Sequence, residues 1–183
     1  MRKEIRFSGF GGQGIILSGF IYGKAAAVFG GLEATMTQSY GPEARGGACT
    51  SDVVIEDKAV SFPEVTNPDI LILMSRDAYI TYKKYIRKGV TLIYDQDLVK
   101  VEEHEGVKLI PVPSMRIAER LGKKIVANIV MLGALAAGID LVSQDHVKEA
   151  VLTSVPSHTK ELNGKAFDAG YKFVVELLEK NKG

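Results

Sequence analysis

Residues 8–14 read SGFGGQG, and the three glycines Gly9, Gly11 and Gly14 have the spacing G-x-G-x-x-G. In dinucleotide sites this pattern follows a strand and opens a helix, so that backbone N–H groups face a pyrophosphate. Here a strand-like run, KEIRFSGF, leads into the glycines, and an apolar segment of helical length follows them. The sequence therefore predicts an anion-binding loop, unless the glycines only permit tight helix–strand packing. The candidate binding residues are Gly9, Gly11, Gly12, Gln13 and Gly14.

NAD is not the favoured ligand of this loop. A nicotinamide site needs an acidic residue at the end of the second strand, about 20 residues on, to bind a ribose hydroxyl. Glu33 falls near that distance, but it begins the predicted strand 33–40, which ends in Gln38, Ser39 and Tyr40. A stand-alone dinucleotide-binding protein or reductase is therefore the alternative to the interpretation given below.

A second motif, SYGPEARGG at residues 39–47, is rich in residues with special backbone preferences. Its Gly-Pro and Gly-Gly pairs predict two turns, with a glutamate and an arginine between them. A guanidinium on a rigid turn suits recognition of an anion or a carboxylate, whereas a Glu–Arg pair that only braces the turn is the alternative. The candidate residues here are Tyr40, Gly41, Pro42, Glu43, Arg45, Gly46 and Gly47.

No set of residues in the sequence has the pattern of a catalytic or metal site. The one cysteine, Cys49, cannot by itself form an internal disulfide or bind zinc or an iron–sulfur cluster, and it is predicted to be a small buried residue. The three histidines, His104, His146 and His158, lie in charged or turn segments with no partner that indicates a base. We therefore predict no catalytic residue and no metal ligand in this chain.

Elements that position the two motifs follow from the periodicity of the sequence. Strand-like and helical segments alternate, which predicts an open, Rossmann-like, mostly parallel sheet with helices on both faces, in a single domain over residues 1–183. In such sheets ligands bind at the carboxyl ends of the strands, where SGFGGQG would lie. Strands are predicted at 3–10, 33–40, 67–75, 90–95 and 107–113, with an extended segment after residue 47, and helices at 14–29, 77–89, 114–122, 125–139, 143–155 and 163–182.

Composition excludes several classes of protein. Of the 183 residues 46% are apolar and 25% are charged, the net charge is +1, and no basic run would follow a nucleic acid. The least polar stretch, 125–139, is shorter than the roughly 20 residues that span a bilayer. It is predicted to be a buried helix, and its single polar residue, Asn128, is predicted to cap a backbone group or to face a substrate. We expect a soluble, cytoplasmic protein.

GFGGQG, followed by MTQSYGPEARGGACTSDVVI and PDILILMS, resembles the gamma subunit of the 2-oxoacid:ferredoxin (acceptor) oxidoreductases. The likeness extends along most of the chain and includes Asn128 before an LGA triplet and the late run ELNGKAFDAGY. Members of that family oxidatively decarboxylate a 2-oxoacid on thiamine diphosphate and Mg²⁺. They pass electrons through iron–sulfur clusters to ferredoxin and release an acyl-CoA. MTQSYGPEARGGAC most resembles the 2-oxoglutarate-type members, and other 2-oxoacids remain alternatives.

The resemblance also implies which tasks fall to other chains. The sequence has no C-x-x-C run for clusters and no GDG with paired asparagines for thiamine diphosphate, so this chain is expected to bind no cofactor alone. Implied partners are the thiamine-binding alpha and beta subunits and a ferredoxin-like delta subunit. The glycine loop would lie on the coenzyme A side of the active site. The second motif would lie at an intersubunit surface, and its residues and Asn128 would have positioning roles.

Overall fold

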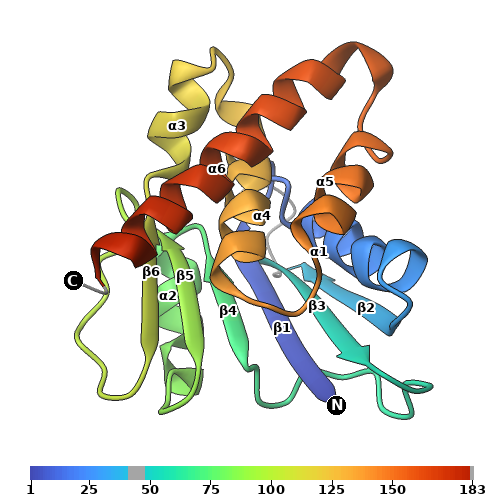
Figure 1. The fold of residues 1–183 in the computed structure, drawn as a ribbon. Helices are drawn as coiled ribbons and strands as arrows, with labels where there is room; N and C mark the ends of the chain where they lie inside the picture. Colours follow the sequence, from blue (N-terminus) through green and yellow to red (C-terminus); the bar gives the residue numbers. More distant parts are fainter. Residues whose placement is uncertain (41–47, 182–183) are drawn as a thin grey trace.

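A six-stranded sheet forms the centre of the computed structural model, which describes residues 1–40 and 48–181 (Figure 1). Within these residues the strand order is β2-β3-β1-β4-β5-β6. The strands are β1 (Arg2–Phe10), β2 (Glu33–Tyr40), β3 (Ala48–Glu56), β4 (Ile70–Leu73), β5 (Thr91–Asp95) and β6 (Lys108–Val112). Each predicted strand is present, and the extended segment after residue 47 is β3.

Strand β3 is antiparallel to both of its neighbours, β1 and β2, whereas β1, β4, β5 and β6 are mutually parallel. Five strands therefore run in one direction, which confirms the mostly parallel sheet. The sequence did not predict that β3 would separate β2 from β1. As a result the end of β2 lies one strand away from the glycine loop.

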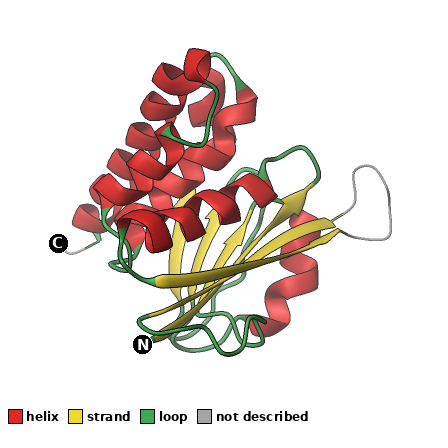
Figure 2. Cartoon of the chain, turned by 90° about the vertical axis from the view of Figure 1, so that its right-hand side faces the viewer, coloured by secondary structure: helices red, strands yellow, loops and turns green. Residues whose placement is uncertain are grey.

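Helices cover both faces of the sheet, as predicted (Figure 2). The larger core lies between the sheet and α1, α4, α5 and α6, whereas α2 covers a smaller core on the opposite face. The helices are α1 (Ile15–Lys24), continued by a π-helical turn (Ala25–Phe29), α2 (Arg76–Tyr82), α3 (Ser114–Arg120), α4 (Ala127–Gly138), α5 (Gln144–Leu152) and α6 (Lys160–Lys180). None of the helices in the described ranges is long and apolar enough to cross a membrane.

The predicted helix at 77–89 is shorter in the structure. It is α-helical only to Tyr82 and continues as a single 3₁₀ turn to Tyr85. The rings of Tyr82 and Tyr85 stack and both lie over the Arg6 guanidinium, at 4.9 and 5.2 Å from it. Because side chains three residues apart align in a 3₁₀ turn, this geometry brings both rings to one cation.

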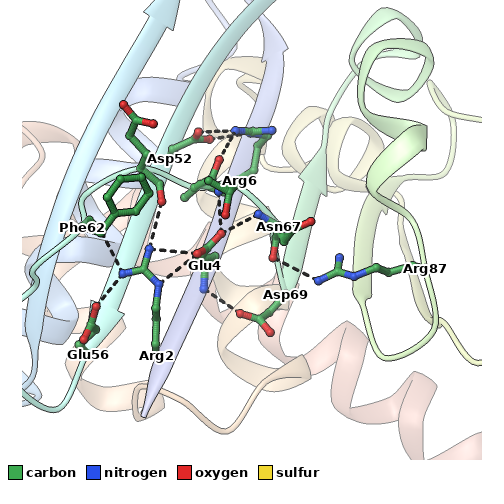
Figure 3. Close-up of polar contacts among 12 residues, drawn as sticks. Arg2, Glu4, Arg6, Asp52, Glu56, Phe62, Asn67, Asp69 and Arg87 are labelled. Atoms are coloured by element: carbon green, nitrogen blue, oxygen red, sulfur yellow. Dashed lines mark hydrogen bonds and ion pairs between the residues drawn. The ribbon is translucent and has the colours of Figure 1, made fainter.

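Charged residues are buried on the face of β1 that is remote from α1 (Figure 3). Arg6 donates from Nε and Nη2 to the two carboxylate oxygens of Asp52 on β3, at 2.8 and 2.6 Å. Glu4 accepts from the backbone N–H groups of Thr66 and Asn67, both at 2.8 Å. These ionic groups hold the segment before β4 against the sheet. Along β1, apolar residues therefore face the larger core and paired charged residues face the opposite side.

Helix α4 is buried between the sheet and α6, which confirms the prediction for the apolar run at 125–139 except at its exposed first residue, Ile125. The two helices approach at glycines. A Cβ at Gly133 would overlap the carbonyl oxygen of Phe167, and one at Gly170 would overlap that of Val130. Backbone therefore meets backbone at this crossing, and only glycine fits at either position.

We predict opposite effects for two glycine substitutions in α6. Gly170→Ala should lower the free energy of unfolding by about 3 kcal/mol, because the new methyl group forces α4 and α6 apart. Gly164→Ala should raise it by about 0.5–1 kcal/mol, since its Cβ would meet only Leu152 at 3.6 Å and alanine favours the helix. Urea unfolding monitored by circular dichroism checks both variants. Equal effects of the two substitutions would contradict this account of the helix crossing.

Candidate functional site

The glycine loop lies at the carboxyl end of β1, where the sequence placed it, and leads into α1. The N–H of Gln13 donates to the carbonyl of Phe10 at 3.2 Å and closes a tight turn. Gly12 and Gly14 have φ values of +93° and +73°. Residues other than glycine rarely adopt this left-handed backbone conformation. The turn therefore depends on glycine at these two positions, and Gly11 and Gly12 are exposed at its tip.

The side chain of Gln13 braces this loop from within. Its Oε1 accepts from the N–H of Phe10 at 2.7 Å, and its Nε2 donates to the carbonyl of Met74, just after β4, at 3.0 Å. A Cβ at Gly9 would overlap Oε1 of Gln13. Gly9 thus makes room for the amide that ties the end of β1 to the end of β4.

Asn128 braces the loop from the other side. The side chain is 2% exposed at the start of α4, and its Nδ2 donates to the carbonyl of Gly14 at 3.2 Å. The same carbonyl accepts from the backbone N–H of Ser18 at 2.9 Å in the first turn of α1. A Cβ at Gly14 would overlap the Asn128 amide, so Gly14 is needed both for its backbone conformation and for this close approach.

A cavity of about 470 Å³ lies beside the loop, between the start of α1, the start of α4 and the turn before α6. Of the predicted site residues, Gly11, Gly12, Gly14, Tyr40 and Asn128 line it, whereas Gly9 and Gln13 lie behind the loop and do not. Most of the wall is apolar. Its main apolar residues are Phe10, Ile15, Ile16, Ile125, Ile129 and Leu162.

The sheet register brings Tyr40 to this cavity across β3. Tyr40 pairs with Cys49, and Cys49 pairs with Gly9, so the three residues form one row across the strands. Tyr40 is 66% exposed at the rim of the cavity. The other predicted residues of the second motif, Gly41, Pro42, Glu43, Arg45, Gly46 and Gly47, lie outside the described residues.

Two titratable residues of the described lining, Cys49 and Lys123, were not predicted as site residues from the sequence. Cys49 is buried as predicted, but it lies in the cavity wall, and burial raises the pKa of its thiol above the ordinary value. Lys123 is a cation in the same lining, whereas its neighbour Lys124 forms an ion pair with Glu119 at 2.9 Å. The only sequence signal for Lys123 was a basic pair directly before the apolar run at 125–139.

The described part of the cavity lining contains neither a histidine nor a carboxylate. None of the three histidines lines it, and its thiol is held protonated by its raised pKa. Across residues 1–40 and 48–181, no group of three or more histidine, cysteine, aspartate or glutamate residues could hold a metal ion. In the described lining the site offers exposed loop backbone, one lysine, the polar side chains of Tyr40, Thr159 and Asn163, and an apolar wall.

Comparison with known proteins gives one consistent result. Residues 4–173 match the family described as pyruvate ferredoxin/flavodoxin oxidoreductase. The chain is 51% identical to 2-oxoglutarate synthase subunit KorC of Methanocaldococcus jannaschii over 180 residues, which cover 97% of this chain and 96% of that protein.

Two solved structures share the fold along nearly the whole chain. The gamma subunit of a keto/oxoacid ferredoxin oxidoreductase from Geobacter sulfurreducens PCA is 39% identical with a TM-score of 0.84, and 95% of this chain covers 99% of that one. A 2-oxoglutarate:ferredoxin oxidoreductase from Magnetococcus marinus, with 2-oxoglutarate, coenzyme A and succinyl-CoA bound, is 28% identical with a TM-score of 0.82. That match covers 96% of this chain and 31% of the longer Magnetococcus marinus chain.

We expect Asn128→Ala to loosen the glycine loop, because the bond from Nδ2 to the carbonyl of Gly14 is lost. The free energy of unfolding should fall by about 1–3 kcal/mol, and exchange of the amide hydrogens of residues 10–18 should accelerate. Asn163→Ala is the matched control, since this buried amide lines the same cavity but, among the described residues, donates to the carbonyl of Thr159 in its own segment. Hydrogen exchange measured by mass spectrometry separates the two, and equal exchange in residues 10–18 of both variants would refute the bracing role.

A second prediction concerns the thiol of Cys49. Alkylation by iodoacetamide at pH 8 should be at least tenfold slower in the folded chain than in urea, because burial excludes the reagent and the raised pKa keeps the thiol protonated. The folded rate should still increase well above pH 9, past the ordinary thiol pKa of about 8.5. Mass spectrometry follows the reaction at one site, because the chain has one cysteine. Similar rates in the folded and unfolded chain would show that the thiol is open to solvent.

Proposed function

Because the chain belongs to the pyruvate ferredoxin/flavodoxin oxidoreductase family, we propose that it is the gamma subunit of a cytoplasmic complex that oxidises 2-oxoglutarate. The complex would decarboxylate 2-oxoglutarate, transfer the succinyl group to coenzyme A and pass two electrons to ferredoxin. The observation that carries this proposal is the 51% identity, over nearly the full length of both chains, to a 2-oxoglutarate synthase subunit. The paired motifs SGFGGQG and SYGPEARGG point to the same class of enzyme.

The redox and thiamine chemistry of this complex belongs to other subunits. An iron–sulfur cluster needs several cysteine ligands, and this chain has one cysteine. We assign thiamine diphosphate and Mg²⁺, which supply the decarboxylation when bound, to the alpha and beta subunits, and the clusters to these chains and a ferredoxin-like delta subunit. The role of this chain is to bind and orient, and the isolated chain is expected to be inactive.

The stand-alone dinucleotide-binding alternative finds no support in the sheet. In a dinucleotide site the second strand lies beside the first, so that an acid at its end reaches the ribose. Here β3 occupies that place, and its first residues, beside Gly9, include Cys49 and Thr50 rather than an acid. The order of the strands therefore favours a ligand other than a dinucleotide.

We assign the cavity to coenzyme A, which combines phosphates with a pantetheine arm that carries methylene and methyl groups between its amides. The exposed backbone at Gly11 and Gly12 and the ammonium of Lys123 would meet phosphate, and the isoleucine-rich wall would meet the arm. The related Magnetococcus marinus enzyme binds coenzyme A and succinyl-CoA, which supports this assignment. The residues of the second motif, including Glu43 and Arg45, stay predicted at the subunit boundary near this cavity.

The decisive experiment is reconstitution of the complex with and without this chain. Reduction of methyl viologen by 2-oxoglutarate should require both coenzyme A and this chain, and pyruvate should be a poor substrate. Full activity without the chain would overturn the assignment as a subunit. Equal activity with pyruvate would overturn the choice of 2-oxoglutarate and leave the subunit assignment intact.

The coenzyme A assignment makes a prediction about two adjacent lysines. In the assembled complex, Lys123→Ala should raise the apparent KM for coenzyme A about tenfold, equivalent to ~1.4 kcal/mol, with little change in kcat, because a cation beside a phosphate is lost. Lys124→Ala should leave the KM unchanged, since this side chain pairs with Glu119 outside the cavity. Steady-state kinetics at varied coenzyme A concentration provide the measurement. An unchanged KM in Lys123→Ala would contradict the assignment of this lysine to the phosphates.

A further inference from the structure

The two edge strands of the sheet, β2 and β6, differ in how easily another strand could pair with them. β6 has only five residues, and Pro111 within it has no N–H to offer another strand. β2 has eight residues, EATMTQSY, with no proline and with a single charge, at Glu33 (Figure 1). In the part of the chain that the structure describes, β2 pairs only with β3, so its outer edge offers free backbone donors and acceptors.

An apolar groove of about 410 Å³ runs along this edge, between α1 and β2. Phe20 and Val28 form its outer wall and are 51% and 66% exposed, although both are large apolar side chains. Ala34 and Met36 of β2 form its floor. An open strand edge next to pockets for alternate side chains is the arrangement by which proteins bind an extended segment as an added strand.

Lys24 is the charged residue in the described lining of this groove. The cation in its lining, Lys24, donates to the carbonyl and hydroxyl oxygens of Thr153 at 3.2 and 2.8 Å and to the hydroxyl of Ser154 at 3.1 Å. Its hydrogen-bonding capacity is thus used within the chain. The other side chains of the lining are apolar except for Thr35, so a complementary segment has apolar side chains at alternate positions.

A second copy of this chain would not fill the groove. Helix α1 lies over β3, because Gly19 and Gly23 face Ser51 and Val53 of that strand. Pairing of two β2 strands about a two-fold axis would therefore separate the two α1 helices by three strand spacings, about 14 Å. Packed helices lie 8–10 Å apart, so both grooves would stay open.

We propose that an extended, apolar segment of a partner subunit adds to the sheet along β2 and places alternate side chains in the groove beside α1. This inference rests on the proposed function and names the surface through which the complex assembles. β2 ends at Tyr40 on the rim of the cavity, and the exposed side chains of Leu17 and Ile125 line the same cavity. A segment bound along β2 thus leads to the cavity mouth, so that docking of the partner closes the coenzyme A site.

Hydrogen exchange in the purified complex tests the added strand directly. Amides of residues 33–40 should exchange at least tenfold more slowly in the complex than in the isolated chain. Unchanged exchange in residues 33–40 of an assembled complex would overturn the inference alone. A wild-type chain that does not assemble with the thiamine-binding subunits would overturn the proposed function, and this inference with it.

Substitutions in the groove provide the second arm of the test. Phe20→Glu and Val28→Glu should each reduce recovery of the complex at least tenfold while the isolated chain keeps its melting temperature, because both side chains are exposed. Ile80→Glu is the matched control, since Ile80 is 53% exposed on α2, on the opposite face of the sheet. Equal recovery for all three variants would contradict the proposal. A dimer of the isolated chain that protects residues 33–40 and is lost in Val28→Glu would replace the partner segment with a second copy.

Discussion

Two side-chain amides, those of Gln13 and Asn128, fix the backbone on which the site of this protein depends. The Gln13 amide connects the turn after β1 to the end of β4. The Asn128 amide connects Gly14, the residue before α1, to the start of α4. Both need glycine opposite them, because a methyl group at Gly9 or Gly14 would occupy the space of the amide. The glycine spacing of the motif is thus in large part a requirement of internal packing.

This bracing changes how the loop can meet a ligand. Gly9 and Gln13 make contacts within the protein and do not line the cavity. The loop therefore exposes mainly the backbone at Gly11 and Gly12 to the cavity. A rigid loop beside an apolar wall suits binding and orientation of a ligand, since no geometry has to be organised when the ligand arrives. Among the described residues, the cavity lining contains no histidine or carboxylate that could transfer a proton.

Helices cover the large core of the molecule, whereas the edge of the sheet at β2 is exposed. Helices α4 and α6 meet backbone to backbone through Gly133 and Gly170, and the far face of β1 is sealed by paired charges such as Arg6 and Asp52. By contrast, β2 and the outer surface of α1 expose apolar side chains and strand edge together. The proposed assembly into a complex requires such a surface, and its position next to the cavity would link assembly to the proposed binding site.

The sequence by itself determined the local elements, since strand periodicity, the glycine loop and the apolar run at 125–139 are each encoded within a few consecutive residues. It also predicted the family, through two motifs at a fixed distance. Only the tertiary structure decided that β3 separates β1 from β2, because the order of strands depends on pairings between distant residues. For the same reason only the structure brought Cys49 and Lys123 to the cavity and turned the Gln13 amide inward, since local periodicity does not encode which side chains meet across a sheet or between helices.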